Sequence, residues 1–232
     1  MSERTIILSI LVIPLLITSA MLQPCKGTDN NITQAPVCAD AAKFISVSYI
    51  DLSKIARISR FRSGEGHDYS DDSENCRSMK HYFEPNDTVD WSAVDIFSPI
   101  DATVTTIRDE SPRGLQVELL STSHPNIVVT IFHVKLDVAP ATGMHYTAGQ
   151  HIGKHVGSIT MSDIAVRTNS PYRLHSLFEF LSDTLFAQFI ARGVPTRDTM
   201  IIPEAARDAD PLNCLGDSFG TAGTLENWVV LQ

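Results

Sequence analysis

I-F-H-V-K-L (Ile131–Leu136) lies within the longest β-like run of this chain, Asn126–Val138, which is rich in Val and Ile. Gly114–Thr122 alternates apolar and polar residues, as a half-buried strand does. Three further short apolar stretches carry a turn or a polar residue at a fixed place: D-I-F-S-P-I-D-A-T-V (Asp95–Val104), A-G-Q-H-I-G (Ala148–Gly153) and S-D-I-A-V (Ser162–Val166). Regular short strands predict a mainly β (α+β) fold, an antiparallel β-sandwich or barrel whose sheet core covers about residues 94–167.

The hydrophobic period changes after this predicted sheet. Pro171 is typical of the first helical position, and Gly193 and Pro195 are typical of a helix end. The pattern predicts a C-terminal amphipathic helix over about residues 171–192 that packs on the sheet. Its apolar residues recur at helical spacing: Leu174, Leu177, Phe178, Leu181, Leu185 and Phe189.

The segment before the predicted sheet is less regular. Asp51 is expected to cap a short helix over residues 51–58. Residues 59–72 are rich in Gly, Ser and Asp and predict a loop, and residues 73–91 predict a second loop. We expect a leader over residues 21–50 and one globular domain over residues 51–232, because a chain of 232 residues is short for two domains.

The charge of the chain excludes one class of partner. The formal net charge is −9, with 18 basic and 27 acidic residues. Binding to a nucleic-acid backbone needs a basic face that displaces counterions, so we expect no nucleic-acid partner.

The N-terminus is typical of an export signal. Ile6–Ile17 is a largely apolar run that contains Ser9 and Pro14, and small residues precede a cleavage position after Ala20. The run is shorter than the roughly 20 residues that a membrane-spanning helix needs. The sequence predicts a signal peptide over residues 1–20, an extracytoplasmic protein and no membrane span after cleavage. A lipid anchor at Cys25 is the less favoured alternative, because Pro24 and Gln23 stand where small residues are preferred.

Four cysteines remain after that cleavage. An even number in an exported protein favours disulfides, and four cysteines allow three pairings. Spacing favours Cys25 with Cys38 as a local loop and Cys76 with Cys214 as a long-range bridge. No C-x-x-C pair is present, which disfavours zinc binding by cysteine.

Together the four apolar stretches resemble the strand skeleton of the lysostaphin/LytM-type zinc endopeptidases, which cut bacterial cell-wall peptides. His67 and Asp71 stand in the H-x-x-x-D relation that supplies two zinc ligands in that family, although Tyr69 replaces the usual glycine. I-F-H-V-K-L resembles the family's Y-x-H-L segment, which implies a catalytic role for His133. A-G-Q-H-I-G resembles the G-Q-x-I-G turn before the last strand. The resemblance therefore implies a zinc cofactor and a hybrid-motif-like sheet.

S-D-I-A-V departs from the family, which has H-L-H-F-E at this place. Asp163 and Ala165 occupy the alternate positions of the two histidines, and alternate strand residues share one face. Asp163 can still ligate zinc, but the methyl group of Ala165 cannot. The expected metal site is thus His67, Asp71 and Asp163, a degenerate set without the H-x-H motif.

Three functions follow from these residues. The favoured one is an exported binding module that has a degenerate metal site and takes an envelope peptide, a glycan or an envelope protein. The second is an active zinc metalloendopeptidase that uses His67, Asp71 and a noncognate third ligand, Asp163 or His81. The third is a disulfide-stapled structural protein of the envelope.

Overall fold

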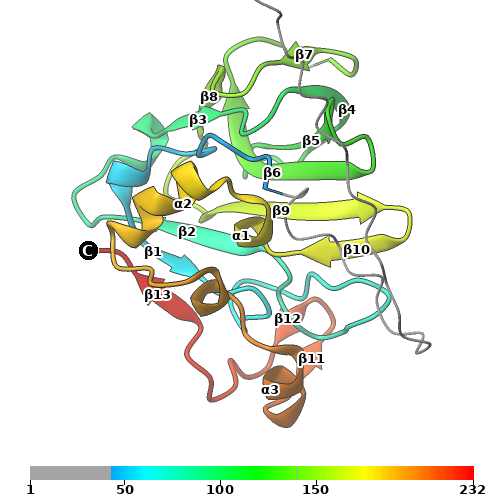
Figure 1. Ribbon diagram of the computed structural model, residues 1–232, viewed down its shortest axis with the longest axis vertical. Helices are drawn as coiled ribbons and strands as arrows, with labels where there is room; N and C mark the ends of the chain where they lie inside the picture. Colours follow the sequence, from blue (N-terminus) through cyan, green and yellow to red (C-terminus); the bar gives the residue numbers. More distant parts are fainter. Residues whose placement is uncertain (1–42, 140) are drawn as a thin grey trace, which may run out of the picture. The chain divides into compact units, whose positions relative to one another are not determined.

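A single antiparallel sheet organises the protein (Figure 1). The computed structural model describes residues 43–139 and 141–232. The main path of the sheet runs in the order β13-β1-β2-β9-β6-β5-β4-β7; off this path, β10 pairs with β9, β8 pairs with β6, and β3 pairs with β8. Its strands are β1 (Ile55–Ser59), β2 (His81–Pro85), β3 (Asp95–Phe97), β4 (Ala102–Asp109), β5 (Leu115–Ser121), β6 (Ile127–Leu136), β7 (His145–Tyr146), β8 (His151–His155), β9 (Ser162–Asn169), β10 (Tyr172–His175) and β13 (Trp228–Val230).

The mainly β, antiparallel fold expected from the sequence is confirmed, with two extensions. The sheet begins before residue 94, because β1 and β2 belong to it, and β13 adds a strand near the C-terminus. A separate hairpin joins β11 (Cys214–Leu215) to β12 (Ser218–Phe219). The expected loop over residues 73–91 is therefore wrong in part, since it contains β2.

Strand β6 changes its hydrogen-bonded partner halfway along its length. It pairs with β9 from Ile127 to Ile131 and with β8 from Val134 onward. His133 lies between these two pairings, and its φ of 62° is in the left-handed region. A non-glycine residue is uncommon there and marks a locally constrained backbone.

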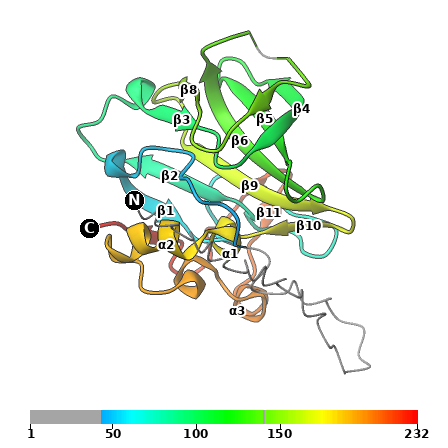
Figure 2. The same cartoon turned by 45° about the horizontal axis from the view of Figure 1, so that its top comes forward.

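The two faces of β2 and β9 have different environments. Phe83, Ile164 and Val166 point into the main core, together with aromatic residues of α1 (Leu177–Phe180) and α2 (Asp183–Ile190). These two helices lie together over the sheet near β2 and β9 (Figures 1 and 2). Alternation along the strands turns the intervening residues, among them Tyr82 and Asp163, to the opposite face.

The helix expected over residues 171–192 is wrong in its first part. Pro171 stands in the turn between β9 and β10, so the chain remains extended until His175. Ser176 then starts α1 with a capping box to Glu179, and α2 follows after Ser182. Gly193, at a φ of 91°, follows the helical segment as expected. The apolar periodicity correctly predicts which side chains are buried. Side-chain hydrogen bonds from Ser176 and Ser182, however, start two separate helices, α1 and α2.

The helix expected over residues 51–58 is also wrong. Asp51 does act as an N-cap and accepts a hydrogen bond from the Ser53 amide, but it caps only the 3₁₀ turn Leu52–Lys54. Ile55, Ile58 and their neighbours continue as β1, which pairs with β2 and β13. Pairing with two strands outweighs the weak helical preference of this short segment.

A disulfide joins Cys76 to Cys214, with the two Cα atoms 5.6 Å apart, as the spacing predicted. It ties the loop between β1 and β2 to the segment that follows α3 (Glu204–Ala209). Cys25, Cys38, the predicted signal peptide and most of the predicted leader lie outside the described residues. Within the described part, no helix combines the length and apolar character that crossing a membrane requires.

Candidate functional site

A cleft of about 1450 Å³ opens on the face of the sheet opposite α1 and α2. Its lining comes from the loop before β2, from β2 itself, from β6, and from the turns that follow β4 and β8. Aromatic rings line it together with six carboxylates. The aromatic residues are Tyr69, Tyr82, Trp91 and Phe132; the acidic ones are Glu84, Asp87, Asp90, Asp109, Glu110 and Asp217.

Lys80 lies at the centre of the cleft floor, and its side chain is only 1% exposed. Its ammonium nitrogen Nζ is 2.5 Å from Asp163 Oδ2 and 3.2 Å from His67 Nε2. Nζ also lies 4.2 Å from the ring centroid of Phe132 and 4.8 Å from that of Tyr69. Aromatic faces attract a cation, so this pocket is built to hold a positive charge.

His67 has the hydrogen-bond pattern of a ligand histidine. Its Nδ1 is 2.8 Å from the Asp68 carbonyl oxygen, which can only accept, so Nδ1 carries the proton. The lone pair of Nε2 is then free to accept from the Lys80 ammonium. Burial first, and then the nearby charge of Lys80, lower the pKa of His67, which keeps the ring neutral. Gly66 makes this loop possible, because a Cβ there would lie 2.1 Å from Tyr82 Oη.

Asp163 is fully buried and has a cation on each side. Lys80 contacts its Oδ2, and His133 Nε2 lies 3.0 Å from its Oδ1. Burial raises the pKa of Asp163, but the charge of Lys80 and the bond from His133 outweigh burial and lower it. Burial likewise lowers the pKa of Lys80, and the attraction of Asp163 outweighs that effect, so the ammonium keeps its proton.

His133 uses both ring nitrogens as donors. Nε2 faces the carboxylate of Asp163, and Nδ1 lies 3.0 Å from the Arg113 carbonyl oxygen and 3.5 Å from Glu110 Oε2. All three partners accept, so the ring is best satisfied when both nitrogens are protonated. Burial lowers the pKa of His133, but the hydrogen bond to Asp163 outweighs burial and raises it.

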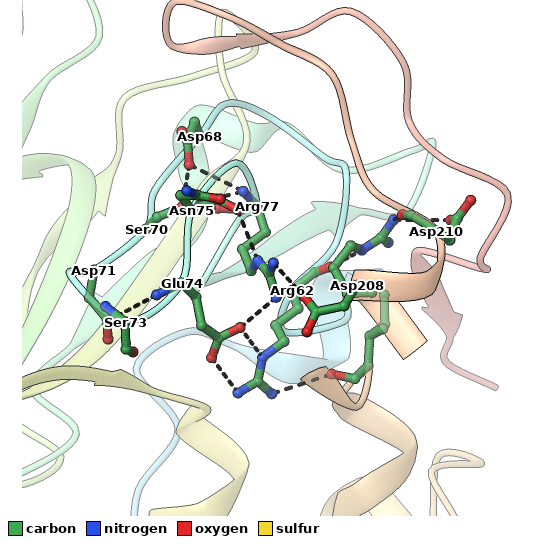
Figure 3. Close-up of polar contacts among 12 residues, drawn as sticks. Arg62, Asp68, Ser70, Asp71, Ser73, Glu74, Asn75, Arg77, Asp208 and Asp210 are labelled. Carbon is green, nitrogen blue, oxygen red and sulfur yellow. Dashed lines mark hydrogen bonds and ion pairs between the residues drawn. The ribbon is translucent and has the colours of Figure 1, made fainter. Parts of the chain in front are cut away.

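Asp71 does not join this group. Its Oδ1 accepts from the Ser73 amide at 2.7 Å, and its Oδ2 accepts from the Leu174 amide at 2.8 Å, so both oxygens hold the loop and β10 together. Figure 3 shows Asp71 beside Ser73, with a further hydrogen bond from the backbone amide of Glu74. The H-x-x-x-D spacing is thus present in sequence, but its two side chains serve different purposes.

The acidic loop around Asp71 is built from internal ion pairs. Glu74 lies 2.6 Å from the guanidinium of Arg62 and 2.7 Å from that of Arg77, and Arg77 also pairs with Asp208 at 2.9 Å (Figure 3). The carboxylate oxygens of Glu74 are therefore already neutralised by arginine.

Ala165, at the place of the second family histidine, supplies no donor, as expected. It is 2% exposed and lies in a small apolar cluster on the cleft side of β9 with Phe61, Met79, Phe132 and Leu174. Apolar side chains thus surround the position at which the family has its second histidine.

The residues present do not fit a zinc ion. His67 Nε2 and Asp163 Oδ2 converge on one point, which the Lys80 ammonium occupies, while Asp71 and Ala165 contribute nothing there. Within residues 43–139 and 141–232, no group of three or more His, Cys, Asp or Glu side chains is arranged to hold a metal ion. Tetrahedral zinc needs three or four such donors.

His81, the alternative third ligand, lies outside the cleft. Its Nδ1 is 2.7 Å from the Ser59 carbonyl oxygen and its Nε2 is 2.8 Å from Ser176 Oγ. The ring is fully buried, and burial lowers its pKa to about 4. It therefore connects β1 to the start of α1 as a neutral side chain.

Acid is expected to destabilise the protein through His81. Between about pH 6.5 and pH 4 the unfolded chain binds a proton at this residue and the folded chain does not, so stability falls as pH falls, by about 1.4 kcal/mol per pH unit. We expect His81→Gln to flatten the pH dependence of unfolding in this window by about 2 kcal/mol between pH 6.5 and pH 5. Urea titrations at several pH values measure this. Parallel curves for variant and wild type would contradict it.

Lys80 is the residue that the sequence did not reveal. It stands in M-K-H-Y-F at the start of β2, where a lysine ordinarily extends to solvent. The one available signal is its alternation with Tyr82, which would place both on one strand face. Its partner Asp163 lies 83 positions later, because Lys80 and Asp163 meet only through the pairing of β2 with β9.

No family model and no curated protein sequence matches this chain. Three similar solved structures are Csd3 from Helicobacter pylori (16% identity, 60% of this chain, 33% of the other, TM-score 0.43), a zinc containing peptidase from Vibrio cholerae (13%, 58%, 39%, 0.41) and lysostaphin (14%, 48%, 49%, 0.32). The chain thus spans less than half the length of each of these proteins. The likeness concerns the fold alone.

Proposed function

We propose that this protein is an exported, non-catalytic binding module that holds a cell-envelope peptide or glycan in the cleft above Lys80. The observation that carries the proposal is the position of the Lys80 ammonium between His67 Nε2 and Asp163 Oδ2. An open cleft above a floor whose charges are already paired is suited to binding. The predicted export signal and the Cys76–Cys214 disulfide support a location outside the cytoplasm.

The protonation states argue against hydrolysis by the side chains of the floor. A general base needs a free lone pair, but both ring nitrogens of His133 face acceptors, the Asp163 carboxylate and the Arg113 carbonyl oxygen. Lys80 keeps its proton and is buried, so its amine is not a nucleophile. The role expected for His133 in catalysis is therefore replaced, in this proposal, by a role in holding Asp163.

The lining suits an extended polar ligand. Aromatic rings and the exposed side chain of Ile159 offer apolar contact, while Asp87, Glu110 and Asp217 can accept hydrogen bonds from amide and amino groups. A peptide or glycan chain presents both kinds of surface. The lining of the cleft includes residues of both the loop before β2 and the turn between β8 and β9.

Ile159→Asp is expected to weaken retention on purified peptidoglycan sacculi by about tenfold. The isoleucine side chain is 58% exposed and lines the cleft, so a ligand would bury it, and burial of this size is worth about 1 to 2 kcal/mol. Co-sedimentation with sacculi at graded protein concentrations measures the effect.

Ile190→Asp is the matched control, because Ile190 is 52% exposed on α2, outside the cleft. Equal retention of both variants, or no retention of the wild type, would reject the cleft as the binding surface. Release of soluble peptide from the sacculi by the wild type, abolished by a chelator, would instead favour the metallopeptidase.

A further inference from the structure

We propose that the Lys80 ammonium is the resident cation of this site and holds His67 and Asp163 in the arrangement that a metal ion would otherwise impose. The inference deepens the proposed function, because a floor with its own cation keeps its shape without any metal.

The geometry around Lys80 has the features of a coordination site. The ammonium has one carboxylate oxygen and one imidazole nitrogen as partners, at 2.5 and 3.2 Å. Each partner is fixed from behind: the Asp68 carbonyl holds His67 Nδ1, and His133 holds the second oxygen of Asp163. Metal-binding histidines and carboxylates are oriented by the same kind of outer contacts.

The surroundings also favour a fixed monovalent cation over a divalent ion. Three aromatic rings, those of Tyr69, Tyr82 and Phe132, lie with their centroids 4.2 to 5.0 Å from Nζ. Rings stabilise an ammonium through their faces but give a divalent ion no lone pair to bind. Because the ammonium belongs to the chain itself, it is always present at the site, whereas a metal ion must bind from solution.

The inference predicts that replacing the ammonium with a ligand opens the site to metal. Lys80→His would place a second imidazole beside His67 and Asp163 and complete a three-donor set. Untagged wild-type protein and the variant are dialysed against zinc, and bound metal is measured by elemental analysis. We expect no stoichiometric zinc on the wild type and about one equivalent on the variant, as three protein ligands suffice for zinc.

Two controls make the result specific. Lys135→His introduces a histidine at an exposed position of β6 and is expected to stay free of zinc. Lys80→His/Asp163→Asn removes the carboxylate and is expected to lose the zinc gained by the single variant. A folded Lys80→His protein without zinc, or equal uptake by both controls, would overturn the inference.

The wild type provides a test that needs no variant to fold. Its thermal melting temperature is expected to be the same with excess zinc and with chelator, since the cation position is already filled. Stoichiometric zinc on the wild type that is lost in His67→Ala would overturn the inference. Because these measurements use zinc alone, their outcome is separate from retention on sacculi.

Discussion

Lys80→Met is expected to lower the free energy of unfolding by about 3 to 5 kcal/mol, the usual cost of removing one partner of a buried ion pair. The substitution keeps most of the side-chain volume but leaves the fully buried carboxylate of Asp163 facing three aromatic rings without its ammonium. His133 still contacts the other oxygen, so the charge is half compensated at best. Equilibrium denaturation in urea at pH 7 measures the loss.

A double variant separates the charge from the packing. Lys80→Met/Asp163→Leu removes both charges, and buried pairs replaced in this way by apolar residues are often neutral in stability. We therefore expect the double variant to be more stable than the single one. Lys135→Met, at an exposed position of β6, is the matched control and should change little. A single variant as stable as the wild type would refute the interpretation of Lys80 as a paired buried cation.

Loss of the Cys76–Cys214 disulfide is expected to cost about 2 to 5 kcal/mol and to loosen the loop that carries His67. The bond closes a segment of 138 residues, so its removal frees a long loop in the unfolded chain. The variant Cys76→Ser/Cys214→Ser, compared with wild type under oxidising conditions, measures this without disturbing the other two cysteines. Thermal melting reports the stability.

The loop gives a second readout of the same change. Proteolysis within residues 60–80 is expected to accelerate in the variant more than cleavage elsewhere, because the disulfide at Cys76 ties this loop covalently to the segment after α3 and only non-covalent contacts remain without it. Uniform acceleration across the chain would show that the bond stabilises the whole fold and does not hold this loop in particular.

The sheet was predictable because its signals are local. Alternation in residues 114–122 and the Val and Ile content of residues 126–138 are properties of single strands, and both segments form strands. Gly153 in β8 reflects a tertiary contact: a Cβ at this position would lie 2.2 Å from the Lys135 carbonyl oxygen, so glycine is required where β8 approaches β6.

The errors came from segments whose structure depends on distant partners. Residues 55–58 have no strong strand pattern and become a strand only because β2 and β13 lie beside them. Helical spacing over residues 174–189 correctly marked buried side chains, yet His175 still belongs to β10 because β9 pairs with that strand. Apolar periodicity therefore predicts which residues are buried better than it predicts whether their backbone is a helix or a strand.

The spatial grouping of the candidate residues can be compared with the sequence, whereas their roles stay predictions. The sequence placed His67, His133 and Asp163 on one site through a family resemblance, and the structure brings these three side chains together around Lys80. Asp71 was misassigned because spacing alone cannot show which backbone amides a carboxylate will meet. Lys80 was missed because nothing local distinguishes a buried, paired lysine from an exposed one.

The change of partner along β6 has a consequence for how this scaffold can diversify. The left-handed backbone at His133 lies where β6 stops pairing with β9 and begins to pair with β8. This main-chain arrangement does not depend on which ligand the cleft binds. A replacement at position 133 would take on this left-handed backbone, and with it the direction in which the side chain projects.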